Sequence, residues 1–114
     1  MSGSPMPVQR RIYNLGPASR IPLGEGKVYE VAGRALAVFR TRQGMLHATQ
    51  AACPHRGGPL ADGVLGSGLV VCPLHGFKFE LSTGSPVGND CRALETYRVE
   101  LTGGGDMLLF LDEP

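Results

Sequence analysis

Two short arms, each offering one cysteine and one histidine, constrain this chain more than any other feature of its sequence. Cys53-Pro54-His55 is followed after sixteen residues by Cys72-Pro73-Leu74-His75. The glycines Gly57, Gly58 and Gly76 lie directly beside the arms. Because glycine permits a left-handed backbone and close approach to a ligand, both arms are suited to holding a metal. The fold must therefore bring two loops together around one metal centre.

The ligand types fit two kinds of metal centre. A structural zinc ion would take Cys53, His55, Cys72 and His75 in one tetrahedron. A two-iron cluster with mixed ligands takes two thiolates on one iron and two imidazoles on the other. Each arm carries one ligand of each type, whereas a common zinc finger groups its cysteines and its histidines separately. The order favours a [2Fe-2S] cluster, with a structural zinc-binding interaction module as the alternative.

The rest of the chain indicates an all-β fold. Its 114 residues match one domain, and its seventeen glycines and nine prolines suit short strands joined by turns. Alternating or apolar runs predict antiparallel hairpins, with turns at Gly33-Arg34, Gln43-Gly44 and Gly66–Gly68. The strands are expected at Arg11–Asn14, Lys27–Val31, Ala35–Arg40, Met45–Thr49, Val64–Leu65, Leu69–Val71, Lys78–Leu81, Tyr97–Leu101 and Met107–Leu111. We expect a flexible lead over residues 1–9 and a single domain over 10–114, with a metal-binding lobe inserted at about 51–80.

Charge and hydropathy exclude several function classes. Eleven basic and ten acidic side chains are interspersed, so a nucleic-acid partner is not expected. No apolar run approaches the ~18 residues that span a bilayer, and the first residues lack the pattern of a signal peptide. Three cysteines, an odd number, argue against a disulfide framework. A reducing, cytoplasmic location without a membrane partner is the expectation.

The sequence closely resembles the Rieske family. The matching runs are Cys53–Gly58 and Cys72–Phe77, and the likeness extends from Ile12 to Leu111. The resemblance implies an antiparallel β-sandwich or barrel with a small inserted lobe that binds one [2Fe-2S] cluster. By this likeness Cys53 and Cys72 hold the inner iron, and His55 and His75 hold the outer iron near the surface.

Departures from the family pattern indicate a low-potential protein. High-potential members carry two further cysteines, at the positions of Gly58 and Leu74 here, and hydroxyl groups at the positions of Phe77 and Phe79. Hydrogen bonds to sulfur raise the potential of a cluster, so their loss predicts a low one. His47 is the only other histidine, too few for the mononuclear iron of a catalytic oxygenase subunit. We expect His47 to be an ordinary strand residue.

The expected function is electron transfer rather than catalysis by the chain itself. The sequence is similar to the small subunit of assimilatory NAD(P)H nitrite reductase and to the Rieske ferredoxins of aromatic-ring dioxygenases, with Cys91–Tyr97 similar to both and Arg98 a departure. This similarity implies a flavin-containing reductase as donor and a terminal metalloenzyme, either a nitrite reductase large subunit or an oxygenase, as acceptor. Cys91 is expected to be packing or a free thiol. Arg56 either balances the charge of the reduced cluster, meets a partner, or is a plain loop arginine.

Overall fold

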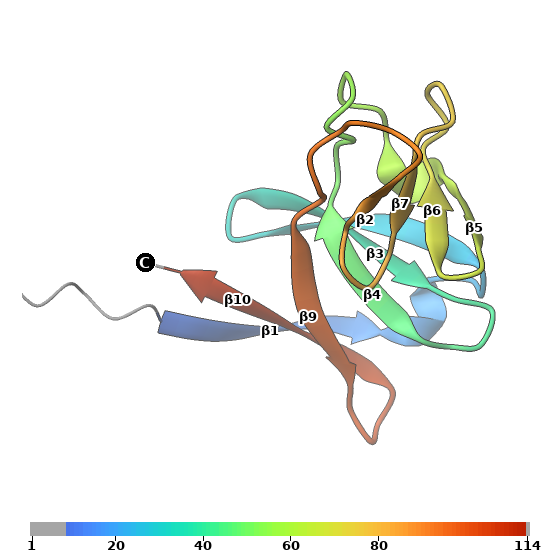
Figure 1. The fold of residues 1–114 in the computed structure, drawn as a ribbon. Coiled ribbons are helices and arrows are strands. Elements are labelled where there is room, and N and C mark those ends of the chain that lie inside the picture. The colour runs from blue at the N-terminus through green and yellow to red at the C-terminus, as the bar shows by residue number, and fades with distance from the viewer. Residues whose placement is uncertain (1–8, 114) are drawn as a thin grey trace, which may run out of the picture.

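The computed structural model describes residues 9–113, which form two antiparallel sheets (Figure 1). The larger sheet has the strand order β1-β10-β9-β4-β3-β2, and the smaller has the order β5-β6-β7-β8. The strands are β1 (Gln9–Pro17), β2 (Glu25–Val31), β3 (Arg34–Arg40), β4 (Leu46–Gln50), β5 (Val64–Gly66), β6 (Leu69–Val71), β7 (Lys78–Glu80), β8 (Pro86–Val87), β9 (Thr96–Leu101) and β10 (Asp106–Glu113). Two 3-10 turns, η1 (Ala18–Arg20) and η2 (Leu60–Asp62), complete the elements. The predicted all-β class is confirmed.

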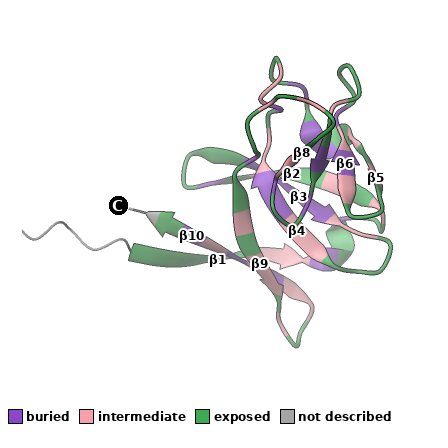
Figure 2. Ribbon diagram, viewed as in Figure 1, coloured by how far each residue is buried: buried purple, intermediate pink, exposed green. Residues whose placement is uncertain are grey.

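Strand β3 separates two hydrophobic cores. Its side chains alternate between the two faces of the sheet, as in any strand. Leu36 and Val38 pack with the β10 side chains on one face, whereas Ala37 and Phe39 pack with the residues of the smaller sheet on the other. All four are buried, which explains why this strand reads as a continuous apolar run (Figure 2).

The smaller sheet is an insertion between β4 and β9. Val70 and Phe79 are its central buried side chains, and they pack with Phe39 of the larger sheet. The predicted lobe at about 51–80 covers β5, β6 and β7. Strand β8 pairs with β7 through Lys78 and Val87, and it was missed because two residues give no periodic signal.

The hairpins are confirmed, with local shifts. The β2–β3 turn lies at Ala32-Gly33, where both residues have positive φ, so Arg34 begins β3 instead of turning as predicted. Strand β1 is longer than predicted because it pairs with β10 along its whole length. It begins at Gln9, inside the expected flexible lead, whose residues 1–8 lie outside the described part of the chain. Within residues 9–113, no helix has the length and apolar character needed to cross a membrane.

Candidate metal centre

The two arms fold into the same turn. In each, the amide of the glycine four residues after the cysteine donates to that cysteine's carbonyl, at 2.9 Å for Gly57 and 3.1 Å for Gly76. The amide of each cysteine then donates to the carbonyl five residues later, Cys53 to Gly58 at 2.8 Å and Cys72 to Phe77 at 2.7 Å. The shared sequence is Cys-Pro-x-x-Gly. The first arm follows β4 and the second joins β6 to β7, and the two tips project in the same direction (Figure 1).

When the two turns are compared position by position, the two histidines do not coincide. His55 is the third residue of its arm, matching Leu74, whereas His75 is the fourth, matching Arg56. Arg56 and His75 both adopt a left-handed backbone, with φ of 61° and 69°. The repeat is visible in the sequence as two Cys-Pro-x-x-Gly runs, in which the two histidines fall at different positions.

The two cysteines lie inside the lobe. Cys53 and Cys72 are 2% and 0% exposed and belong to the same core. Their thiols interact directly, and the backbone amide of His55 donates to the Cys53 sulfur. Burial raises the pKa of the Cys53 thiol to about 11, with the neighbouring Cys72 and Cys91 adding to the shift. A metal at this position would have to displace the proton.

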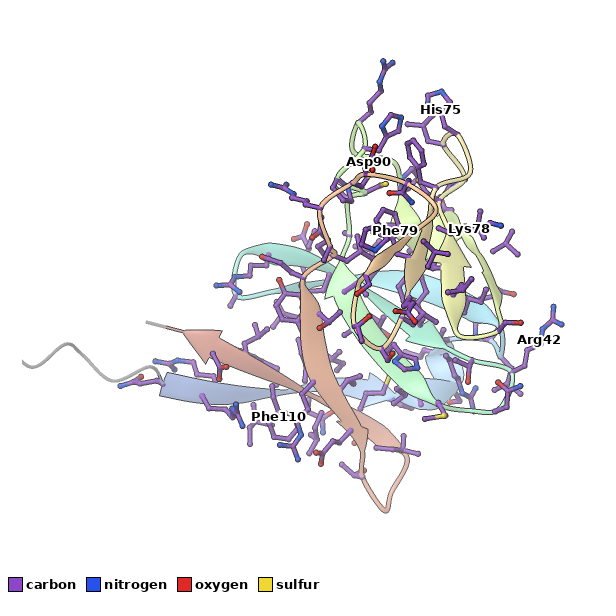
Figure 3. The ribbon with its side chains drawn as sticks, in the orientation of Figure 1. Arg42, His75, Lys78, Phe79, Asp90 and Phe110 are labelled. Carbon is purple, nitrogen blue, oxygen red and sulfur yellow. The ribbon has the colours of Figure 1, made fainter. Side chains whose placement is uncertain are left out.

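The two histidines lie at the outer end of the centre. Nε2 of His55 is 3.0 Å from Nδ1 of His75, and the ring of His55 stands at 89° to the ring of Phe77 with centroids 4.1 Å apart. His75 is exposed at the tip of the second arm (Figure 3). The pKa of His55 is lowered, first by partial burial and then by His75 and the Arg56 guanidinium. The arms thus pair thiol with thiol and imidazole with imidazole.

The pairing of like donors bears on the kind of metal. Among residues 9–113, no three His, Cys, Asp or Glu side chains are arranged to hold one ion. The two thiols lie inside the lobe and the two imidazoles at its outer end, as two pairs of like donors. This is the donor arrangement of a two-iron cluster with mixed ligands.

Gly58 and Leu74 face each other across the arms. A Cβ at position 58 would lie 3.0 Å from the Cβ of Leu74 and 2.7 Å from the Sγ of Cys72. These are the two positions at which the sequence lacks the cysteines of high-potential relatives. Phe77 is half-buried, and Phe79 is fully buried in the core that contains Cys72.

The other candidate residues lie outside the metal centre. His47 is a half-buried strand residue of β4 opposite Phe39, as expected. Cys91 is a free, half-buried thiol that packs against the core of the lobe, which agrees with the packing expectation. Sequence reasoning missed its closeness to Cys53. The sequence contains a third cysteine outside the arms, but this fact alone does not show that its side chain lies near Cys53 in the fold.

Comparisons with known proteins agree with this geometry. The Rieske [2Fe-2S] domain family matches residues 11–98. Ferredoxin CarAc of Metapseudomonas resinovorans is 33% identical over 68% of this chain and 73% of its own. Three other curated relatives are much longer, and the chain spans less than a quarter of each.

Solved structures share the fold. A Mycobacterium tuberculosis protein assigned as the small subunit of an NADH-dependent nitrite reductase superposes with a TM-score of 0.83 at 20% identity, covering 90% of this chain and 96% of its own. The ferredoxin of carbazole 1,9a-dioxygenase from Nocardioides aromaticivorans gives 0.78 at 25% identity, covering 86% and 95%. The chain belongs to the Rieske [2Fe-2S] family, whose electron-transfer domain holds its cluster with two cysteines and two histidines.

Proposed function

We propose that Cys53 and Cys72 hold one iron of a [2Fe-2S] cluster, that His55 and His75 hold the other, and that the protein is a low-potential one-electron carrier. The observation that carries this proposal is the pairing of like donors, with the thiols buried and the imidazoles at the surface. The cluster supplies reversible one-electron chemistry when bound. The chain's own residues hold it, keep water from the thiolates and leave the histidine end open.

The residues around the four donors suit such a group. The amide of His55 donates to the Cys53 sulfur, an interaction that favours the thiolate. Gly58 has no side chain where one would meet the Cys72 sulfur. Leu74, partly exposed, and the half-buried Phe77 flank the arms and limit solvent access. These features hold buried thiolates close together, which two-iron coordination requires.

The three cysteines allow a matched test of the ligand set. We expect the purified protein to absorb visible light, to contain iron and sulfide, and to give a paramagnetic signal on reduction. Cys53→Ser and Cys72→Ser should lose these properties, whereas Cys91→Ser should keep them. A colourless protein that binds one zinc ion after anaerobic isolation would support the alternative, a structural zinc-binding module.

The histidines separate a redox role from a structural one. His55→Ala should abolish electron transfer from a flavin-containing reductase, because it removes a ligand at the exposed end. Unchanged electron transfer in this variant would contradict a carrier function. The fold would then hold a cluster that serves only to stabilise the lobe.

The proposed partners are a flavin-containing reductase and a terminal metalloenzyme, and the first candidate is a nitrite reductase large subunit. The similarity to the M. tuberculosis protein motivates this choice. A dioxygenase ferredoxin is the second candidate, favoured by the identity to Ferredoxin CarAc. A similar ferredoxin is solved as a complex with the oxygenase of carbazole 1,9a-dioxygenase. Reconstituting the chain with each type of terminal enzyme, and measuring NAD(P)H-driven turnover, distinguishes the two.

A further inference from the structure

The end of the first arm carries an arginine in a backbone conformation that side chains rarely adopt. Arg56 has φ of 61° and is followed by Gly57 at 72°, so two consecutive residues are left-handed. A non-glycine residue in this region costs on the order of 1 kcal/mol or more. Local backbone preference would favour glycine here, so the guanidinium needs another explanation.

Arg56 is free to meet another molecule. It is exposed and makes no hydrogen bond or ion pair with any of residues 9–113. Its place in the first turn is the place of His75 in the second. The guanidinium and the His75 imidazole therefore stand at equivalent positions of two adjacent turns, and Arg56 directly follows His55 in the chain.

Within the two arms, the charge comes from Arg56. Within the arms, residues 53–58 and 72–77, it is the one side chain with a permanent charge. Over the wider segment 51–92 three basic side chains oppose three acidic ones: Arg56, Lys78 and Arg92 against Asp62, Glu80 and Asp90. The segment as a whole is neutral, and the permanent charge that the arms themselves present at the histidine end is that of Arg56.

Resting on the proposed carrier function, we propose that Arg56 selects the redox partner by binding a carboxylate on the partner's docking surface, next to the histidines. Arginine presents a planar fork of donors that matches a carboxylate, and it stays charged at all working pH values. Its place beside His55 would hold an acidic protein surface against the end through which electrons pass. The partner class is thus an oxidoreductase whose docking site is acidic.

Two small outer-sphere oxidants of opposite charge test this selection without a cognate partner. The reduced protein is mixed with ferricyanide, an anion, or with hexaamminecobalt(III), a cation. Each oxidant takes one electron from the cluster, which returns to its diferric state. The ratio of the two rate constants cancels any change in cluster potential, because the same change in donor potential acts on both reactions.

We expect Arg56→Glu to lower the anion-to-cation rate ratio by roughly tenfold at low ionic strength, with the effect shrinking as salt is added. Arg56→Gly, which suits the left-handed backbone, should give a smaller fall in a fully folded protein. Arg42→Glu is the control, since Arg42 is exposed in the β3–β4 turn, away from His75 (Figure 3). Arg42→Glu changes the net charge of the protein by the same amount as Arg56→Glu.

Equal changes for Arg56→Glu and Arg42→Glu, or no change in either, would overturn the proposal while leaving the carrier function intact. If neither oxidant reacts with dithionite-treated wild-type protein, the carrier function is refuted. The docking role of Arg56, which depends on that function, is then refuted as well. In a reconstituted system, Arg56→Glu should also weaken the salt dependence of the rate with an acidic partner.

Discussion

A Cβ at Gly58 would lie 2.7 Å from the Sγ of Cys72, closer than real side-chain contacts allow. Gly58 also accepts the Cys53 amide through its carbonyl, at 2.8 Å. One glycine of the first arm therefore contacts both cysteines, Cys53 through a hydrogen bond and Cys72 through the space that its missing side chain leaves. A side chain at this position therefore requires the Cys72 sulfur or the backbone of an arm to shift.

We expect Gly58→Ala to lower the iron content of the purified protein and to destabilise it by about 1–3 kcal/mol, the usual cost of overpacking a core. Gly66→Ala is the matched control, because a Cβ there meets nothing within 4 Å and its φ is not positive. Iron analysis and chemical denaturation measure the two effects. Wild-type iron content and stability in Gly58→Ala would show that the thiols tolerate displacement.

We expect the potential of the cluster to depend on Phe77, two residues after His75. The wild-type protein should have a midpoint near the lower end of the ~−150 to +300 mV range of Rieske centres. Phe77→Ser introduces a hydroxyl donor, whereas Phe77→Ala removes the ring without adding one. A net hydrogen bond of about 0.5–1.5 kcal/mol corresponds to roughly 20–60 mV for one electron. Spectroscopic redox titration should therefore give the serine variant the higher potential, and equal midpoints would exclude this explanation.

The sequence predicted the parts of the molecule that local rules govern. The alternation in β2 and the apolar run of β3 identified strands. The types and order of four side chains predicted a two-iron centre, the cofactor of the family to which the chain belongs. Contacts between distant segments were not predictable. Strand β8 forms because the edge of β7 is open for it to pair with. Cys91 packs against the core of the lobe because the chain passes the lobe again before β9 begins. The Ala32-Gly33 turn was missed because alanine rarely adopts positive φ.

The metal-free protein should lose stability at alkaline pH. Burial raises the pKa of Cys53 from its ordinary value near 9.0 to about 11 in the folded state. The folded protein therefore keeps this proton between about pH 9 and 11, where the unfolded chain has released it, so the free energy of unfolding falls as pH rises through that window. The loss is on the order of 2 kcal/mol.

Denaturation of the metal-free protein at pH 8 and at pH 10.5 measures this effect. Cys53→Ala should show a smaller decrease between the two pH values, because the variant has no thiol to titrate at this position. Identical slopes for wild type and variant would assign the alkaline sensitivity to other groups. The cluster-loaded protein should not follow this pattern, since a thiolate bound to iron carries no proton.

His47 should titrate below its ordinary value. The imidazole is half-buried in β4, and this burial lowers its pKa from 6.5. The unfolded chain therefore binds the proton more tightly, and the folded protein should lose stability as pH falls through the unfolded value of about 6.5. NMR titration of the His47 ring should give a midpoint below 6.5, and His47→Gln should lose less stability than wild type between pH 7.5 and 5.5. A midpoint at or above 6.5 would mean that water reaches the ring more freely than its half-buried position in β4 indicates.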